Sequence, residues 1–211
     1  MSTLVSETEY QEIIRKSRFL ARATNIAGAA DAMDFIARVS DPAANHNCWA
    51  YRLGNEYRFS DDGEPGGTAG RPILQAIEGQ ACDRVVVVVT RWFGGVKLGT
   101  GGLVRAYGGC AAQCLRLADK TELVAYRYAR ISCTFAELPV FRARLGELGV
   151  RIEDESFTAE GVDWQLAAPQ DVAPRAGQLL TDISRGRLQV EWQDDAETLP
   201  AGRRDQSSAS S

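Results

Sequence analysis

The sequence has few of the residues on which acid–base, nucleophilic and metal chemistry depend. Its 211 residues include one histidine, His46, and five cysteines, and no two cysteines have Cys-X-X-Cys spacing. A single imidazole leaves few mechanisms for general acid–base catalysis, and neither paired histidines nor paired cysteines offer a zinc site. Cys48 shares a strand face with His46, but a Cys–His nucleophile pair also needs a third, orienting group. We therefore expect a protein that is not an enzyme and that holds no metal or other cofactor.

Long apolar runs and a strong excess of positive charge are also missing. No apolar run approaches the ~18 residues of a membrane span, and the first residues lack the order of a signal peptide. We therefore expect a cytoplasmic protein with reduced cysteines and no membrane partner. The net charge is −4, which is not the strongly basic footprint of a protein dedicated to duplex DNA.

The charge is unevenly distributed along the chain. Residues 1–134 hold 16 lysines and arginines against 14 acidic residues, whereas residues 135–211 hold 8 against 14. A polyanion is attracted by local clusters of positive charge. Any contact with RNA is therefore expected to be local and to lie in the first part of the chain.

The most informative stretch runs from Arg84 to Cys110. Five consecutive valines predict a strand that is buried on both faces. The residues after it combine a guanidinium, two aromatic rings, an ammonium and several glycines ahead of a predicted helix, and bare amides leading into a helix N-terminus form an anion-binding concavity. The spacing matches neither a Walker loop nor the dinucleotide-binding fingerprint. The residues concerned are Arg91, Trp92, Phe93, Gly94, Gly95, Lys97, Gly99 and Arg105.

Two interpretations of this turn remain open. In the first, the glycines only reverse the chain, and Trp92 and Phe93 fill the core. In the second, the turn is an exposed site for a phosphate or carboxylate, with Arg91 and Lys97 facing solvent. The two also combine if one ring lies inside and the other outside.

Asp61, Asp62 and Glu64 form an acidic loop around Gly63. Three carboxylates on a flexible backbone suit a hard cation such as Mg²⁺, although the ligand spacing of an EF-hand is absent. They also suit hydrogen bonds within the protein, with an arginine such as Arg91 as one partner, or contact with a binding partner. Together with the turn after the valine strand, the loop predicts a groove of mixed charge.

Hydrophobic periodicity and turn residues predict the elements of the first part. A strand and a short helix come first, followed by a hairpin around Gly54-Asn55 and a helix that opens near Thr68 with Pro72 in its first turn. The valine strand and a glycine-rich helix complete this part. The ranges are 9–23 and 27–39 for the first strand and helix, 47–53 and 56–59 for the hairpin, and 85–90 for the valine strand.

The order of predicted elements changes after Thr121. Strands are expected at 124–133, 150–157, 162–168 and 188–192, and helices at 138–148 and 172–184. This β-α-β-β-α-β order is that of a ferredoxin-like unit. We therefore predict an α+β protein with one domain at 1–133, a second at 134–195, and a disordered tail at 196–211.

Four motifs resemble the YigZ/IMPACT family. They are KSRF at 16–19, HNCWAYR at 46–52, FSDDGEPGGTAGRP at 59–72 and RWFGGVKLGTGGLVRAYGG at 91–109. The resemblance covers both halves of the chain. It implies a ribosomal protein S5 domain 2-like fold for the first domain, and for the second a ferredoxin-like fold similar to the last domain of elongation factor G. The family's motif positions fall on His46, Asn47, Tyr51, Arg52, Asp61, Asp62, Gly63 and Glu64, and on residues 91–95, 98 and 99.

The resemblance also carries expectations about function. The eukaryotic relatives are regulators of translation, and for the bacterial ones contact with nucleic acid or the ribosome is implied. We therefore expect a non-enzymatic, translation-associated regulator that binds RNA, the ribosome or a translation factor through the turn and the acidic loop. Phosphates would meet Arg91, Lys97 and Arg105, and bases or a protein partner would meet the nearby rings.

Two other classes of function remain open. One is a small-molecule binder or enzyme that takes a phosphorylated ligand with the glycines and the acidic loop. The other is a protein–protein adaptor that does not bind RNA. The sequence predicts no oligomeric state.

Overall fold

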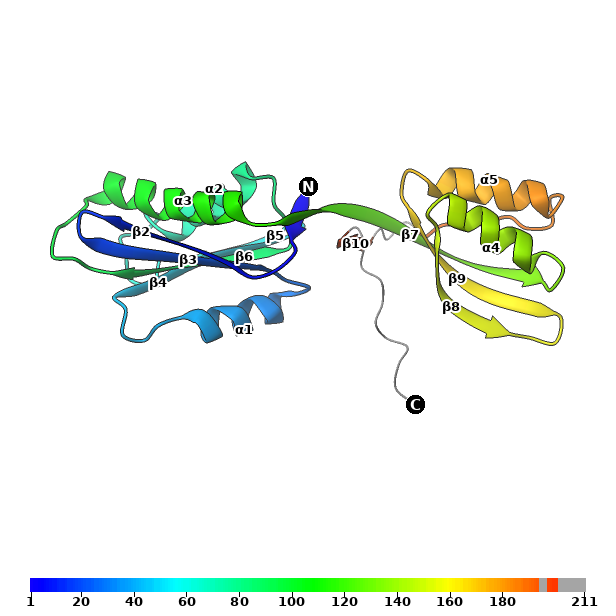
Figure 1. Cartoon of the computed structure of the whole chain (residues 1–211), viewed down its shortest axis with the longest axis horizontal. Coiled ribbons are helices and arrows are strands. Elements are labelled where there is room, and N and C mark those ends of the chain that lie inside the picture. Colours follow the sequence, from blue (N-terminus) through cyan, green and yellow to red (C-terminus); the bar gives the residue numbers. More distant parts are fainter. Residues whose placement is uncertain (194–196, 201–211) are drawn as a thin grey trace. The chain divides into compact units, whose positions relative to one another are not determined.

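The computed structural model describes residues 1–193 and, for the backbone only, residues 197–200. The chain forms two compact units, Met1–Glu122 and Leu123–Ser211 (Figure 1). Their boundary lies inside β7 (Lys120–Thr134), earlier than the predicted boundary after residue 133. The start of this long strand pairs with β1 (Ser2–Leu4) in the first unit, and residues 126–134 pair within the second. One strand therefore belongs to both units.

The first unit is a five-stranded antiparallel sheet with helices on both faces. Its strand order is β2-β3-β6-β4-β5. Helices α2 (Gly70–Gly79) and α3 (Thr100–Leu117) cover one face, and α1 (Ala29–Val39) covers the other (Figure 1). The predicted helices and hairpin are present. The strands are β2 (Thr8–Ile14), β3 (Ser17–Asn25), β4 (His46–Leu53), β5 (Glu56–Ser60) and β6 (Val85–Trp92).

The five valines of β6 divide between two cores. Val85, Val87 and Val89 belong to the core under α2 and α3, whereas Val86 and Val88 belong to the core under α1. Successive side chains of a strand point to opposite faces, so a central strand covered by helices on both sides needs an unbroken apolar run. The prediction of a strand buried on both faces is confirmed.

The single strand predicted at 9–23 is a hairpin of two strands. β2 and β3 are joined at Arg15 and Lys16, whose φ angles are 46° and 68°. Two-residue hairpin turns require positive φ at such positions, and Asn-Gly or Asp-Gly normally signals them. An Arg-Lys pair is not such a signal, and the turn was therefore not predicted.

The second unit is built of antiparallel strands with two helices on one face (Figure 1). The strand order is β7-β9-β8. Trp164 of β9 is buried in the core that α4 and α5 share with the sheet. The predicted strand, helix, strand, strand, helix order is confirmed. After β7 it runs through α4 (Leu138–Glu147), β8 (Arg151–Phe157), β9 (Gly161–Pro169) and α5 (Ala173–Ile183).

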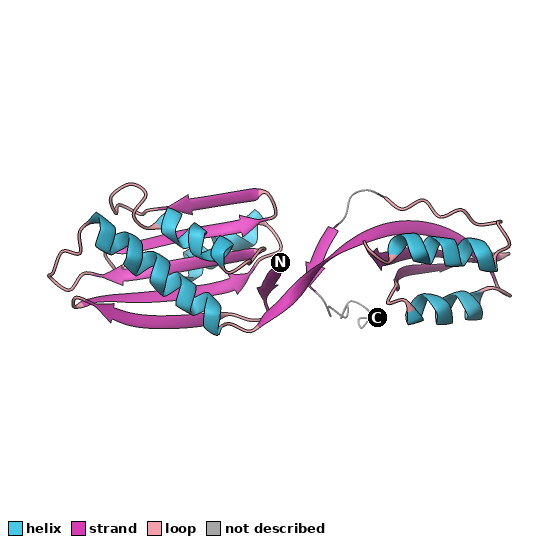
Figure 2. Ribbon diagram, turned by 90° about the horizontal axis from the view of Figure 1, so that it is seen from above, coloured by secondary structure: helices cyan, strands magenta, loops and turns pink. Residues whose placement is uncertain are grey.

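The last strand predicted in this unit, at 188–192, is wrong. Leu188, Val190 and Trp192 pack against the core of the second unit, but the segment belongs to no strand and is drawn as a loop in Figure 2. Alternating apolar residues indicate that one side of a segment is buried. They do not by themselves indicate that its backbone pairs with a neighbour.

The edge of β7 opposite β9 is occupied by a later strand. β10 (Glu197–Pro200) pairs with residues 123–126 of β7, and Tyr126 also pairs with β9 on the other side. The predicted disorder of the tail is therefore wrong for these four residues. The rest of that prediction, residue 196 and residues 201–211, lies outside the described residues.

Candidate functional site

The candidate site is a groove in the first unit, where β6 ends and α3 begins. Its volume is about 480 Å³. Parts of the glycine turn, the acidic loop and the HNCWAYR motif meet there, and we call it the α3 groove. Six of its lining residues belong to the predicted site, namely His46, Glu64, Arg91, Phe93, Lys97 and Gly99.

The floor of the α3 groove is a buried group of three hydrogen-bonded side chains. Arg91 Nη1 donates to Glu64 Oε1 at 2.6 Å, and the hydroxyl of Tyr107 donates to the same oxygen at 2.6 Å. Burial raises the pKa of Tyr107, which keeps its proton available to Glu64. Arg91 is only 5% exposed. The expectation that Arg91 faces solvent is therefore wrong, because β6 continues through it and turns its side chain onto the face that carries α2 and α3.

One nitrogen of this floor has no partner. Arg91 Nε is buried and makes no hydrogen bond with any residue that the structure describes. The guanidinium carbon lies 5.6 Å from the ring centroid of Phe19 and 5.5 Å from that of Phe93. A buried N–H without an acceptor is costly. The floor of the groove therefore retains unused hydrogen-bonding capacity.

The rim of the α3 groove contains the amino end of α3. Gly99 precedes the helix with φ 74°, and no side chain caps it. The first amides of a helix have no intrahelical partner, and the helix dipole makes this end partly positive. Lys97 is exposed at the same rim, and a guanidinium nitrogen of Arg105 lies 3.7 Å from the position that a Cβ on Gly101 would take. Two cations therefore accompany the free helix end.

The two rings of the turn have different surroundings. Phe93 is 45% exposed and lines the α3 groove. Trp92 follows the opposite alternation of β6 and is half-buried beneath Arg18, whose guanidinium carbon lies 3.6 Å from its ring centroid. Of the open alternatives, the one with a single ring facing outward is observed, and that ring is Phe93.

Gly94 connects the groove to the first hairpin. Its amide donates to Ser17 Oγ at 3.2 Å, and a Cβ at this position would lie 1.9 Å from the carbonyl oxygen of Lys16. Only glycine permits such a close approach. Two motifs that are far apart in sequence, KSRF and RWFGG, are therefore in contact. The exposed residues Arg15 and Lys16 add positive charge beside the loop that carries Phe93.

Asp61 is used inside the chain, at the start of α2. Its carboxylate accepts the backbone amides of Gly67 at 2.8 Å, Ala69 at 3.0 Å and Gly70 at 2.8 Å. Burial works to raise the pKa of this carboxyl, but the three hydrogen bonds outweigh it and hold the pKa below its ordinary value. Asp61 therefore caps α2, which begins at Gly70, close to the predicted opening near Thr68.

Asp62 and His46 hold each other through the backbone. Asp62 Oδ2 accepts the amide of Asn47 at 2.5 Å, and His46 Nδ1 donates to the carbonyl oxygen of Asp62 at 2.7 Å. His46 Nε2 then lies 3.8 Å from Glu64 Oε1. All three acidic residues thus have partners within the chain. Of the alternatives for the acidic loop, hydrogen bonds within the protein are the one observed. No group of three His, Cys, Asp or Glu among the described residues is placed to hold a metal ion.

Replacing Asp61 by alanine is expected to cost about 1–2 kcal/mol of unfolding free energy at neutral pH, because three amides lose their acceptor. The folded-state pKa lies below the unfolded value of about 4. The stabilisation is therefore present above that pH and is lost as the pH falls through the folded-state pKa. Urea unfolding of both proteins at neutral pH and at about pH 3 should show the difference narrowing on acidification.

The control for Asp61 is Asp34→Ala, at an exposed position of α1. This change should leave the unfolding free energy within about 0.5 kcal/mol of the wild type at both pH values. If the cost of Asp61→Ala stayed the same at low pH, the carboxylate would not be the acceptor that holds α2.

Three residues of the HNCWAYR motif that were predicted to bind a partner make hydrogen bonds within the chain. Tyr51 is buried, and its hydroxyl donates to Glu56 at 2.7 Å. Arg52 Nε donates to the carbonyl of the hairpin turn at the far end of β4. The side-chain amide of Asn47 donates to the carbonyl oxygen of Asp41 and accepts its amide. The buried Tyr51 is therefore not accessible to a partner, whereas Asn47 and Arg52 are half-buried and their contact with a partner stays a prediction.

Four lining residues of the α3 groove were missed, and a fifth, Leu98, was named only as a motif position. Asn45 accepts the amide of Phe93 at 2.8 Å through its side chain and so fixes the loop that carries the ring. Pro65, Leu98 and Leu103 form an apolar wall of the groove, and Thr100 is the first residue of α3. Asn45 directly precedes the HNCWAYR motif and the other four lie inside the two long motifs, so the motifs themselves were the available signal. The five are Asn45, Pro65, Leu98, Thr100 and Leu103.

The cysteines fill the interior, as expected. All five are free and buried. The thiol of Cys48 donates to the carbonyl oxygen of Asp61, and burial raises its pKa. A nucleophilic cysteine needs the opposite, a lowered pKa. The geometry therefore does not support a Cys–His nucleophile pair with His46.

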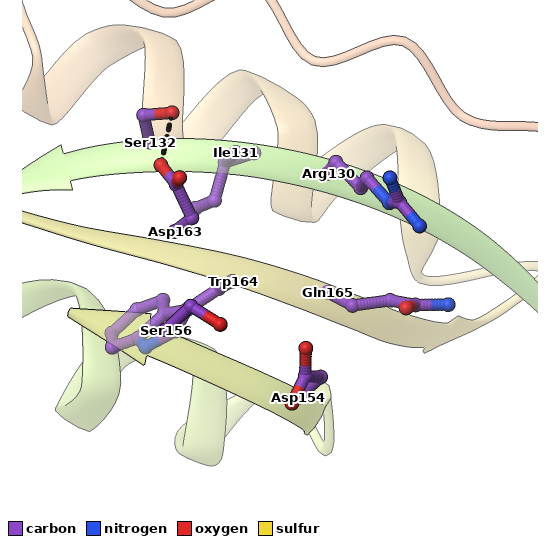
Figure 3. Close-up of a pocket in the computed structure, with 8 residues that line it drawn as sticks. All are labelled: Arg130, Ile131, Ser132, Asp154, Ser156, Asp163, Trp164 and Gln165. Atoms are coloured by element: carbon purple, nitrogen blue, oxygen red, sulfur yellow. Dashed lines mark hydrogen bonds between the residues drawn. The ribbon is translucent and has the colours of Figure 1, made fainter. Parts of the chain in front are cut away.

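A second hollow, of about 400 Å³, lies on the sheet of the second unit (Figure 3). Its polar side chains alternate with the buried ones of β7 and β9, so they line the sheet face opposite α4 and α5. Ser132 donates to Asp163 at 2.6 Å. Arg130 is accompanied by two aspartates, Asp154 and Asp163. This balance of charge does not favour an anionic ligand, and the α3 groove is the stronger candidate.

Fold and groove together define a mixed α/β protein of two units, with a groove on the first that is built around a buried ion pair and a free helix end. No helix of the described part is both long and apolar enough to cross a membrane. Residues 15–115 match the Impact N-terminal domain, and residues 131–187 match a domain of unknown function, DUF1949. The chain belongs to the YigZ/IMPACT family, as the four motifs indicated.

Individual relatives support this assignment over most of the chain. An IMPACT family member from Thermus thermophilus is 48% identical over 181 residues, which cover 85% of this chain and 99% of the relative. The IMPACT family member YigZ of Escherichia coli is 37% identical over 189 residues, covering 85% and 91%. A crystal structure of a hypothetical protein is similar with a TM-score of 0.63 at 33% identity, covering 90% of this chain and 95% of the other.

Proposed function

We propose that this protein is a translation-associated regulator that binds single-stranded RNA through the α3 groove. The observation that carries the proposal is the arrangement of Phe93, which is 45% exposed, beside Lys97 and the uncapped amino end of α3. Aromatic faces that stack bases, placed next to cations that meet phosphates, are the usual means of binding single strands. Membership of the YigZ/IMPACT family supports the link to translation.

Further positive charge on the same unit favours RNA over an uncharged protein partner. Arg105 lies in the second turn of α3 with its guanidinium near Gly101, and Arg15 and Lys16 are exposed on the hairpin that touches Gly94. The groove itself holds Glu64 and Arg91, whose charges compensate one another. The cations of the rim are therefore available for a polyanion.

We propose a binding role and not a catalytic one. His46 is the only histidine of the chain, its Nδ1 is engaged with a carbonyl oxygen, and Cys48 is a buried thiol. We also propose that the two units are S5 domain 2-like and ferredoxin-like, that the protein acts in the cytoplasm, and that its partner is RNA of the translation machinery.

Replacing Lys97 or Arg105 by glutamine is expected to weaken RNA binding equally for all sequences. The slope of log affinity against log salt concentration is negative, and each lost phosphate contact should reduce its magnitude by about 0.7. Fluorescence anisotropy of a labelled single-stranded RNA between about 50 and 200 mM salt measures both quantities.

The matched control is Arg116→Gln. Arg116 is exposed on α3 like Arg105, but it lies in the last turn of the helix. The Arg116→Gln substitution removes the same charge as Arg105→Gln. It should leave both the RNA affinity and its salt dependence unchanged. Slopes that are the same for the wild type, Lys97→Gln and Arg105→Gln would refute the proposed RNA surface.

A further inference from the structure

The recognised part of the RNA follows from the shape and chemistry of the α3 groove. We propose that the groove binds the terminal phosphomonoester of a nucleotide, with the phosphate at the amino end of α3 beside Lys97 and the nucleoside against Phe93. This rests on the proposed function only for the source of the nucleotide, since a free nucleoside monophosphate and the 5′ end of an RNA share this chemistry.

The phosphate end is defined by donors for which the described part of the chain provides no acceptor. α3 has 18 residues, and its amino end carries no side-chain cap. The amides of Thr100, Gly101 and Gly102 are the first of the helix and so have no intrahelical acceptor. Lys97 and Thr100 line the groove at this end. A helix end joined by an ammonium group is a strong site for a phosphate.

A second feature of the groove also points to an anionic ligand. Arg91 is 95% buried, lines the groove, and uses Nη1 for Glu64 while Nε has no partner in the described part of the chain. One carboxylate therefore does not satisfy this guanidinium. Because a buried, unpaired N–H is unfavourable, an oxygen of the ligand that reaches Arg91 Nε from the groove satisfies this donor. Glu64 compensates the charge of Arg91, so the net positive charge at the site comes from Lys97.

The remaining walls fit the nucleoside. Phe93 offers an exposed ring face, and Leu98, Leu103 and Pro65 supply the apolar wall. Glu64 accepts both of its hydrogen bonds through Oε1, so Oε2 remains for a hydroxyl or amino donor of the ligand. A volume of about 480 Å³ is within the range of pockets for small organic ligands.

A terminal phosphate suits the groove better than an internal one. A phosphomonoester carries between one and two negative charges near neutral pH and presents three terminal oxygens, whereas a phosphodiester carries one charge and two such oxygens. A phosphomonoester therefore offers the helix amides and Lys97 one more terminal oxygen and more negative charge than a phosphodiester does. The buried floor of Arg91, Glu64 and Tyr107 closes the groove from beneath, so a ligand can enter only from the open side.

The test compares two RNAs of one sequence, about ten nucleotides long, with a fluorophore at the 3′ end and either a phosphate or a hydroxyl at the 5′ end. Anisotropy titrations use the full chain. We expect the wild type to bind the 5′-phosphorylated RNA at least about tenfold more tightly, as charge-assisted hydrogen bonds to one additional charge imply. Calorimetric titration with AMP and with adenosine forms the second arm, in which only AMP should bind.

Paired variants locate the phosphate. Lys97→Gln should reduce the preference for the 5′-phosphate to below about threefold, whereas Arg116→Gln should leave it intact. Thr100→Pro removes the first amide of α3 at a position where proline is tolerated, and Thr100→Ala retains that amide. Only the proline variant should lose the preference. Thermal melting confirms that each variant is folded.

The outcomes separate this inference from the proposed function. If the wild type binds both RNAs equally, the inference is overturned and RNA binding stands. If neither RNA binds but AMP does, with adenosine inactive, the proposed function fails and the inference holds for a free nucleotide. If neither RNA nor AMP binds, both fall. A 5′-phosphate preference that survives in Lys97→Gln and Thr100→Pro would place the phosphate elsewhere and overturn the inference.

Discussion

Replacing Glu64 by alanine is expected to destabilise the protein by about 3–5 kcal/mol, because it leaves the buried charge of Arg91 without its counter-ion. The same change removes the acceptor of the Tyr107 hydroxyl, which is also buried. An exposed ion pair would cost only about 0–1 kcal/mol when broken. Urea unfolding of the wild type and the variant, monitored by tryptophan fluorescence and circular dichroism, measures the difference.

The control for this prediction is the double variant Glu64→Leu with Arg91→Met. Replacing a whole buried pair by apolar side chains of similar volume is often neutral or stabilising, so the double variant should recover most of the lost stability. If Glu64→Ala cost less than about 1 kcal/mol, the floor of the α3 groove would be solvated. Arg91→Ala should be as damaging as Glu64→Ala, which makes Lys97 the better position for probing ligand binding.

The role of Arg91 illustrates why the site was only partly predictable. The valine run predicted β6 correctly because burial on both faces leaves a local pattern in the sequence. The environment of the guanidinium is set instead by Glu64, 27 residues earlier in the chain, and by Tyr107. Such partners leave no periodic signal, so Arg91 resembled the exposed Lys97 in a glycine-rich turn. Tertiary packing buries Arg91 and leaves Lys97 exposed.

The same distinction separates the elements that were predicted from those that were not. Helices and strands with regular apolar spacing, such as α1 and β9, were found at nearly the right residues. The hairpin at Arg15-Lys16 and the unpaired segment at 188–192 were not. Both depend on which backbone groups find partners across the fold. That choice is tertiary, and local spacing does not report it.

Replacing Gly94 by alanine is expected to cost about 3 kcal/mol, at the upper end of the range for overpacking. The new Cβ would lie 1.9 Å from the carbonyl oxygen and 2.1 Å from the carbonyl carbon of Lys16. Both are backbone atoms that cannot rotate away, so the hairpin and the loop that carries Phe93 must separate. Unfolding free energy from urea titration and melting temperature from calorimetry measure the cost.

Two control variants attribute this cost to the contact with Lys16. Gly109→Ala lies inside α3, where nothing is within 4 Å of the new Cβ, and should stabilise the protein by about 0.5–1 kcal/mol through helix propensity. Ser17→Ala removes the hydrogen bond to the Gly94 amide without adding volume and should cost about 1–2 kcal/mol. If Gly94→Ala were as harmless as Gly109→Ala, the hairpin and the RWFGG loop would not touch. Phe93 belongs to this loop and would be displaced with it. Gly94→Ala should therefore also weaken ligand binding, and neither control should weaken it to the same extent.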